Sequence, residues 1–273
     1  MLRAIAGVYV RVFGRGARIT IASQAVALLR RFGTDAHVYL PGLGVINGLT
    51  AGNYLDSALT TAATVNNPVG GVVDGNGAIN ATQATTANKP ILRLTSGKYS
   101  WQFDGSNDTL ALGSVPFQMA DDHCVVVGLS SSSYASLLQA FYNGGSSGAS
   151  RCASLFISAT TGTPTFFWRD NASVSTTLIL PAASLGEFQI VSGRKVGTAV
   201  IARKNGASKQ SGSVSTLGAT TVARCDIGSL QGVSNIHNGS IGPVIAIKGT
   251  VTDAELLTLE RFVSSLTPSG PVF

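Results

Sequence analysis

Runs of alternating apolar and polar residues fill the sequence from residue 91 to residue 247. A period of two is typical of strands that bury one face, and turn-forming residues separate these runs. Asn205-Gly206 is the clearest turn, because both residues tolerate the positive φ of a tight hairpin. The pattern predicts about a dozen antiparallel strands. They are expected at 91–94, 99–103, 109–112, 123–127, 136–142, 152–157, 165–168, 176–180, 188–191, 198–202, 223–227 and 241–247.

The end of the chain has a helical pattern instead. Thr252 and Glu255 have the spacing of a capping box, and Pro268 marks the end of the helix. The apolar residues between them fall on one helical face. These residues are Leu256, Leu259, Val263 and Leu266. We expect one amphipathic helix at about 252–266 that closes the domain.

The most specific stretch is residues 79–112, which read INATQATTANKPILRLTSGKYSWQFDGSNDTLAL. Two strands flank the turn at Gly97-Lys98, and a dense turn signal at 104–108 leads into a third strand. Together they predict an antiparallel meander. Trp101 and Phe103 alternate with polar residues, so we expect both in the core.

This stretch also resembles a known family. The order ATQAT, ANKP and W-x-FDG-x-ND-x-L is similar to the entry into the laminin-G-like, concanavalin-A-like jelly roll of many bacteriophage and prophage virion proteins. Residues 56–58 and 64–70 resemble the family's lead-in, and 238–256 its closing strand and helix. The resemblance implies an all-β antiparallel β-sandwich in a virion. Its motifs are turns and strands, and they imply no catalytic residues.

Composition divides the chain into three parts. Residues 1–40 form a basic N-terminal arm, and residues 41–90 form a lead-in rich in Gly, Ala, Thr and Asn. Residues 91–273 form the jelly-roll sandwich with its closing helix. The lead-in has few aromatic residues and begins with the break at Pro41-Gly42. We therefore expect turns and extended segments that wrap onto the sandwich.

Positive charge is concentrated in the arm. The chain has 19 basic and 13 acidic residues, and six arginines precede the first acidic one, Asp35. They are Arg3, Arg11, Arg15, Arg18, Arg30 and Arg31. The pattern predicts strands at 8–13 and 18–21 and a helix that is capped by Ser23 and ends at Gly33. The arm is either an extra strand and helix laid on the body or an anchor whose arginines bind a partner.

Several classes of function find no support. The arm has no nucleic-acid motif, so the acidic surface of a neighbouring protein is the preferred partner over nucleic acid. Cys124, Cys152 and Cys225 lack CxxC spacing and indicate buried thiols. No apolar run approaches the ~18 residues of a membrane span, and no secretory signal is recognised. We expect the protein to be made in the host cytoplasm.

Catalysis is not expected. Glycosidases of the concanavalin-A-like fold use paired carboxylates, commonly in an E-x-D-x-x-E cluster. The only glutamates are Glu187, Glu255 and Glu260, and no such cluster exists. The sequence also lacks a G-x-S-x-G elbow and a phosphate-binding loop. No organic cofactor is expected.

One calcium site is a candidate. Asp104, Asn107 and Asp108 could offer the oxygen ligands that Ca²⁺ prefers, and laminin-G-like domains sometimes bind calcium at their rim. The alternative is turn chemistry, in which the same side chains bond nearby backbone amides.

Aromatic residues beside polar ones suggest glycan contacts. Rings that stack on sugars, with amide and carboxylate groups that bond hydroxyls, are typical of lectins. The candidates are Trp168, Asp170, Asn171, Tyr142 and Asn143. The alternative is ordinary core aromatics and solvated turns.

Together these patterns predict a non-enzymatic structural protein of a bacteriophage particle, either a tail or fibre component or a capsid decoration. The arm would dock onto other virion proteins and copies of the same chain, and the jelly roll would face outward, touching host-surface polysaccharide. A free lectin-like adhesin module and a glycan-degrading enzyme are the alternatives.

Overall fold

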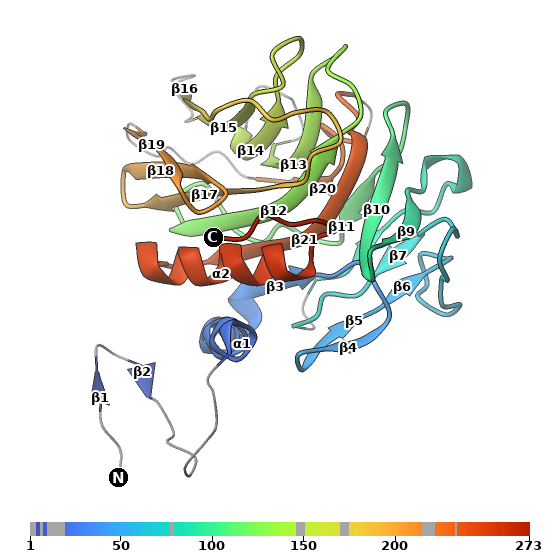
Figure 1. Cartoon of the computed structure of the whole chain (residues 1–273), viewed down its shortest axis with the longest axis horizontal. Coiled ribbons are helices and arrows are strands. Elements are labelled where there is room, and N and C mark those ends of the chain that lie inside the picture. Colours follow the sequence, from blue (N-terminus) through green and yellow to red (C-terminus); the bar gives the residue numbers. More distant parts are fainter. Residues whose placement is uncertain are drawn as a thin grey trace.

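The computed structural model describes residues 4–5, 8–9, 20–76, 79–145, 151–169, 175–214, 222–232 and 234–273. Within these residues two antiparallel β-sheets pack face to face, and two helices cover the outer face of one sheet (Figure 1). The predicted antiparallel β-sandwich with a C-terminal helix is confirmed.

The first sheet has eight strands. Its order is β19-β18-β17-β12-β21-β10-β9, and β3 pairs with β21 further along the edge that β10 occupies. The strands are β3 (Ala36–Tyr39), β9 (Ile91–Thr95), β10 (Lys98–Asp104), β12 (His123–Ser131), β17 (Gln189–Val196), β18 (Ala199–Lys204), β19 (Ser208–Ser213) and β21 (Asn238–Lys248). The predicted hairpin at Asn205-Gly206 joins β18 to β19. The sequence pattern had not predicted β3 or β19.

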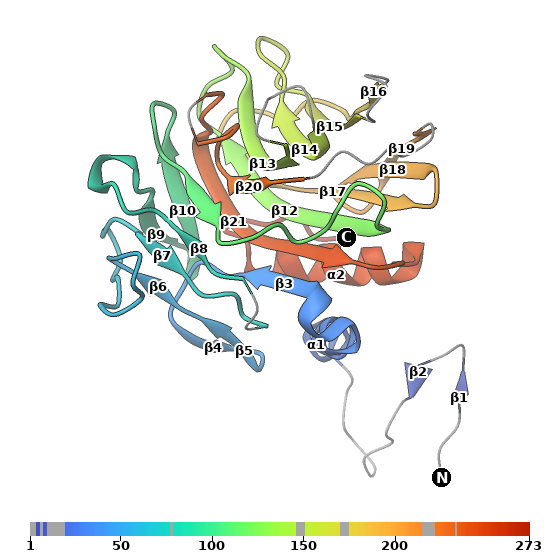
Figure 2. The same ribbon diagram turned by 180° about the vertical axis from the view of Figure 1, so that it is seen from behind.

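The second sheet has nine strands in the order β16-β15-β14-β13-β20-β11-β8-β7-β6. They are β6 (Asn53–Tyr54), β7 (Gly71–Val72), β8 (Ala81–Thr82), β11 (Leu110–Leu112), β13 (Leu138–Gly144), β14 (Arg151–Ile157), β15 (Pro164–Arg169), β16 (Ser175–Ile179) and β20 (Arg224–Ile227). Figure 2 shows the three shortest strands, β6, β7 and β8, at one edge. Residues 41–90 thus supply three strands of this sheet.

Two apolar clusters stabilise these layers. The larger lies between the sheets and includes Trp101 and Phe103, which confirms their predicted place in the core. The indole Nε1 of Trp101 donates a hydrogen bond to Asn53, whose amide also donates to the carbonyls of Leu40 and Gly42. The second cluster lies between the eight-stranded sheet and the helices. Trp101 therefore ties the sandwich core to the start of the lead-in.

The helices are α1 (Ile21–Phe32) and α2 (Asp253–Leu266), with short 3₁₀ turns η1 (Gly33–Asp35) and η2 (Thr86–Asn88). The capping box of α2 is confirmed. In α1 the predicted cap is corrected, because Thr20 is the N-cap and Ser23 is the third helical residue of a capping box. The strand predicted at 18–21 is contradicted at its end, since Ile21 already begins the helix.

Much of the predicted arm belongs to the folded body. Helix α1 packs against α2, where Arg31 forms an ion pair with Glu255. Strand β3 is buried along its whole length and pairs with β21. Residues 20–40 therefore form the extra strand and helix on the body. Of the first nineteen residues only β1 (Ala4–Ile5) and β2 (Val8–Tyr9) are described, and they pair with each other.

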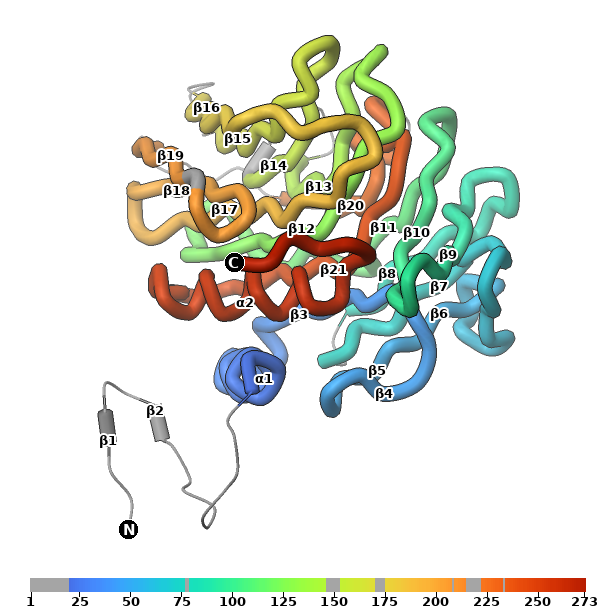
Figure 3. Tube along the Cα trace, in the orientation of Figure 1, coloured from blue at the N-terminus to red at the C-terminus, as the bar shows by residue number. Residues whose placement is uncertain are grey.

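The remaining elements lie on the outside of the sandwich. The hairpin of β4 (Gly44–Ile46) and β5 (Leu49–Ala51) places Leu49 and Ala51 in the second apolar cluster, beside the helices. The last residues run back along α2 (Figure 3), where Arg261 donates to the Phe273 carbonyl at 2.9 Å. None of the described helices has the length and apolar character needed to cross a membrane.

Candidate functional site

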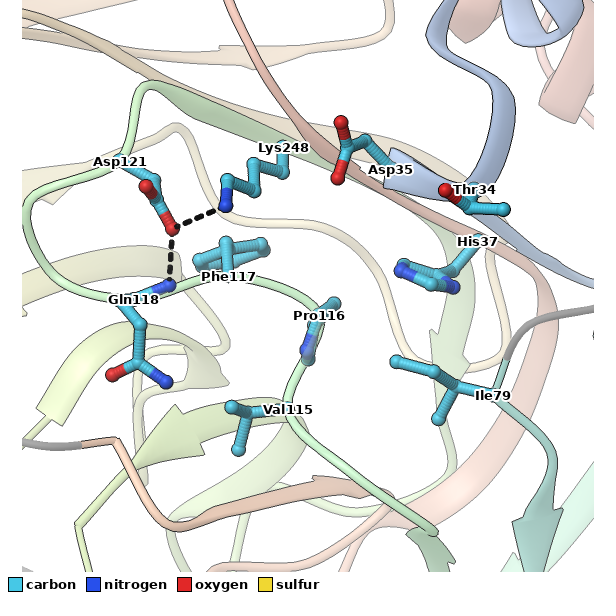
Figure 4. Close-up of a pocket in the computed structure, with 10 residues that line it drawn as sticks. All are labelled: Thr34, Asp35, His37, Ile79, Val115, Pro116, Phe117, Gln118, Asp121 and Lys248. Carbon is cyan, nitrogen blue, oxygen red and sulfur yellow. Dashed lines mark hydrogen bonds and ion pairs between the residues drawn. The ribbon is translucent and has the colours of Figure 1, made fainter.

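An open cleft of about 290 Å³ lies at one end of the sandwich (Figure 4). It is bordered by η1 and the start of β3, by the loop that joins β11 to β12, by the last residue of β21 and by one residue of the lead-in. The lining residues are Thr34, Asp35, His37, Ile79, Val115, Pro116, Phe117, Gln118, Asp121 and Lys248. Four distant parts of the sequence therefore build one cleft.

The floor of the cleft is apolar and supported from behind. The buried Phe117 ring stacks on His123, with ring centroids 4.2 Å apart. His123 Nδ1 donates to the Asp121 carbonyl (2.9 Å), and its Nε2 accepts from Trp168 Nε1 (3.1 Å). Burial lowers the pKa of His123 to about 4, so the ring is neutral near neutral pH, as the bond from Trp168 requires. The floor is therefore held in one geometry.

His37 lines the wall and is oriented by a buried carboxylate. Its Nδ1 lies 2.8 Å from Asp74 Oδ2. The same carboxylate accepts from the backbone N–H groups of Val38 (2.9 Å), Asn76 (3.0 Å) and Ile79 (3.1 Å). Burial acts to raise the pKa of Asp74, but the hydrogen bonds from His37, Val38 and Asn76 outweigh it and lower the pKa below its ordinary 3.8. Asp74 is therefore ionised near neutral pH.

The ionised carboxylate fixes which nitrogen of neutral His37 carries the hydrogen. A carboxylate only accepts hydrogen bonds, so neutral His37 carries its hydrogen on Nδ1. Its Nε2 then holds a lone pair, and this atom has no hydrogen-bond partner among the described residues. His37 is 2% exposed and lines the cleft.

The rim of the cleft is charged. Asp121 Oδ2 accepts from the Gln118 backbone N–H (2.7 Å) and lies 3.6 Å from Lys248 Nζ. The Gln118 side chain turns away, because its Oε1 accepts from the Val222 backbone at 2.9 Å. Asp35 is exposed at the rim. The polar side chains of this cleft are thus mainly acceptors.

The His37–Asp74 pair raises the question of catalysis. A His–Asp pair can act as a general base, but covalent catalysis also needs a nucleophile within its reach. Among the ten lining residues Thr34 has a hydroxyl and Lys248 an amine, but neither forms a hydrogen bond with His37 in the described part of the chain. The three glutamates lie elsewhere: Glu187 bonds the Ser184 backbone, Glu255 completes the cap of α2, and Glu260 is buried beside Arg203.

The sequence-based glycan contacts are wrong where the structure describes them. Trp168, Tyr142 and Asn143 are buried and do not line the cleft, so they offer no surface to a sugar. Tyr142 donates to the Gly145 carbonyl (2.9 Å), and Asn143 donates to the Phe117 carbonyl (3.0 Å). Trp168 and Asn143 instead support the floor of the cleft from behind. The other two candidates, Asp170 and Asn171, lie outside the described residues.

Of the six arginines of the arm, two lie within the described residues and four do not. Arg3, Arg11, Arg15 and Arg18 lie outside the described residues. Arg30 is exposed on α1, and Arg31 is engaged within the chain through Glu255 and the Phe32 ring, 4.5 Å away.

The calcium candidates form a turn with bonds of its own. Asp104 accepts from the backbone of Ser106 (2.7 Å) and Asn107 (3.3 Å), and Asp108 accepts from the Asp104 backbone (2.9 Å). No group of three or more His, Cys, Asp or Glu side chains within the described ranges is placed to hold a metal ion. The observed bonds are those of the alternative interpretation, turn chemistry.

Replacing Asp108 by asparagine is expected to stabilise the fold near neutral pH. Burial raises the pKa of Asp108 from 3.8 to about 6, so its contribution is most favourable below pH 3.8 and is lost as pH rises through 6. An amide removes the buried charge and keeps the acceptor for the Asp104 backbone. The free energy of unfolding should rise by about 1 to 2 kcal/mol at neutral pH, measured by urea denaturation.

The same comparison below pH 3.8 should show no gain, because Asp108 is then protonated in both states. Asp35→Asn is the control for loss of an exposed charge and should change stability by no more than about 0.5 kcal/mol. An equal gain at both pH values would contradict the proposed cost of the buried charge.

Comparisons with known proteins show likeness in fold only. No protein-family model matches the sequence, and a search of curated proteins finds no significant match. Trypanosoma rangeli sialidase in complex with the inhibitor DANA is similar at TM-score 0.56 and 11% identity over 89% of this chain and 38% of that one. The botulinum neurotoxin serotype D binding domain is similar at TM-score 0.53 and 10% identity over 83% and 52%.

A third similar structure is the carbohydrate-binding module CBM40 of Ruminococcus gnavus IT-sialidase, bound to α2,3-sialyllactose. Its TM-score is 0.45 at 18% identity, over 52% of this chain and 83% of that one. Together with the strand order, the two likenesses above TM-score 0.5 agree with the concanavalin-A-like jelly roll expected from the sequence.

Proposed function

We propose that this chain is a non-enzymatic, glycan-binding structural protein of a bacteriophage particle. The observation that carries the glycan-binding part is the cleft at the end of the sandwich, with its fixed apolar floor and polar rim. The resemblance of residues 79–112 and 238–256 to jelly-roll virion proteins supports the placement in a particle.

The cleft has the dimensions and chemistry of a small saccharide site. Its volume of about 290 Å³ is close to the lower end of small-ligand pockets. Sugar rings present apolar C–H faces and a rim of hydroxyl donors. The apolar floor at Pro116 and Phe117 suits the C–H faces of the sugar. The acceptors of Asp35, Asp121 and His37 suit its hydroxyl donors. Because the floor is held in place, little ordering would oppose binding.

Blocking the cleft should abolish binding to a glycan array. Val115 is half-buried in the wall, so Val115→Trp would fill space that a sugar ring needs. We expect at least a tenfold loss of affinity for any bound glycan, or about 1.4 kcal/mol. Val45→Trp is the matched control, because Val45 is 72% exposed on the β4–β5 hairpin and does not line the cleft.

Both variants should retain the circular dichroism spectrum and unfolding midpoint of the native protein. If no glycan binds the native protein, or if Val115→Trp binds as well as the native chain, the cleft is not a glycan site.

The basic arm is the segment that we propose attaches the chain to the particle. Four of its arginines precede α1, whereas α1 itself is fixed to the body through Arg31 and Glu255. A rigidly attached helix would hold the preceding residues at a defined place, where arginines can bind carboxylates of a neighbouring protein or copy. The proposed anchor is therefore residues 1–19.

Mass analysis of purified particles tests this placement. We expect the full chain in the particles and loss of incorporation when residues 1–19 are deleted, with the isolated protein still folded. A chain that never enters particles but binds glycans would favour the alternative of a free adhesin module. Unchanged incorporation after the deletion would refute the anchor.

A further inference from the structure

The hydrogen-bonding groups of the cleft are unevenly divided between donors and acceptors. Asp35 and Asp121 present carboxylates, and neutral His37 presents the lone pair of Nε2, since its Nδ1 donates to Asp74. Lys248 is the charged donor, and it lies 3.6 Å from Asp121. Thr34 adds a hydroxyl that can act either way. The cleft therefore favours a ligand rich in donors.

The charged groups near the cleft also favour a ligand that donates hydrogen bonds and carries positive charge. Asp35, Asp74 and Asp121 bring three carboxylates to the cleft or directly behind it, against the single ammonium group of Lys248. Lys195 lies behind the Asp121 loop, where its Nζ donates to the Asp121 carbonyl (3.0 Å), and the neighbouring carboxylate of Asp122 offsets its charge. In the neutral form of His37, the cleft has more carboxylates than cationic groups.

Asp35 is the carboxylate left for a ligand. The Asp121 carboxylate already accepts from Gln118 and faces Lys248, and Asp74 is buried with several donors. Asp35 has no ion-pair partner in the described part of the chain. Figure 4 shows Asp121 and His37 on opposite sides of the cleft, with Asp35 between Lys248 and Thr34.

We propose that the cleft selects a saccharide that carries a protonated primary amine, such as a glucosamine unit, over N-acetylated and acidic sugars. This inference rests on the proposed function and names its ligand class. The ammonium group donates to the Asp35 carboxylate and to His37 Nε2, while ring hydroxyls bond the remaining acceptors. A sugar carboxylate in the same place meets the excess negative charge and is rejected.

Titration calorimetry with the full chain tests this selection near neutral pH, where primary sugar amines are still largely charged. Glucosamine oligosaccharides should bind at least tenfold more tightly than N-acetylglucosamine oligosaccharides of equal length, because a hydrogen bond to a charged group is worth about 1.5 to 3 kcal/mol. Sialyllactose should bind more weakly than either. Equal affinities, or a preference for the acidic sugar, would overturn the proposal.

Asp35→Asn should remove most of the tenfold preference and leave binding of the acetylated sugar intact. The matched control is Asp104→Asn, which removes an equal charge far from the cleft. Asp104 pairs with Asn238 at the first residue of β21, whereas the cleft residue Lys248 is the last residue of that strand. That control should keep the preference.

The failures of the two proposals are distinguishable. An array on which no glycan binds defeats the proposed function itself. Glycan binding with a preference that Asp35→Asn leaves unchanged defeats only the amine selection. A lysine oligopeptide that binds as tightly as the glucosamine oligomer, with the same dependence on Asp35, would overturn the assignment to a saccharide.

Discussion

Replacing Trp101 by alanine is expected to lower the free energy of unfolding by about 3 to 5 kcal/mol. Trp101 is fully buried between the two sheets, and its ring is among the largest side chains of the core. Its indole N–H also donates to Asn53, which holds the carbonyls of Leu40 and Gly42. Alanine leaves both a cavity and an unpaired amide oxygen, so the two costs add.

Urea denaturation of three variants separates these costs. Trp101→Phe keeps most of the apolar volume and loses the bond to Asn53, so we expect a smaller loss of about 1 to 3 kcal/mol. Leu94→Ala, on the neighbouring strand but 45% exposed, should cost less than about 1 kcal/mol. An alanine variant as stable as the exposed control would show that Trp101 does not hold the lead-in to the core.

Local patterns predicted the strands from 91 onward, except β19, and the closing helix. These elements are long enough to show a period, and the cap at Thr252 and the turn at Asn205-Gly206 mark their boundaries. Strands β6, β7 and β8 have two residues each, too few for any period. Strand β3 is covered on both faces, so all four of its residues are buried and four residues are too few to show a pattern.

The candidate glycan residues show a different limit. A period of two divides a strand into two faces, but it does not say which face is covered. Trp168 and Phe166 proved to share the inner face and lie in the same core cluster. Tyr142 is buried although it pairs with Asp226 and lies outside that cluster. Aromatic residues beside polar ones therefore did not mark a surface.

The cleft could not be found from spacing. His37 and Asp74 are 37 positions apart, and Lys248 joins them only because β21 pairs with β3. No motif links such residues, since the sheet and not the local sequence brings them together. One signal was available: Asp74 is an acidic residue in a lead-in that has few of them. An isolated charge among small residues is a reason to look for a buried partner.

Asp74→Asn is expected to lower both the stability of the fold and the affinity of the cleft for its ligand. In the native protein Asp74 Oδ1 accepts from Val38 and Asn76, and Oδ2 accepts from Ile79 and His37 Nδ1. In the variant the amide oxygen can replace Oδ1, but the amide N–H₂ takes the place of Oδ2 and cannot accept. One buried donor is left unpaired, so the free energy of unfolding should fall by about 2 to 4 kcal/mol. His37 must accept at Nδ1, which moves its hydrogen to Nε2. The cleft then presents a donor where the native protein presents an acceptor.

Two measurements identify this effect. The pKa of Asp74 is lowered from 3.8, so its stabilisation is present above that pH and is lost as pH falls through the folded-state value. The difference in stability between native protein and variant should therefore shrink in acid. Affinity for glucosamine oligosaccharides should fall at least tenfold near neutral pH, since the ammonium loses its acceptor. Asp226→Asn, the same change at another fully buried carboxylate, should leave that affinity unchanged. An Asp74 variant that binds normally would show that the orientation of His37 does not set the selectivity of the cleft.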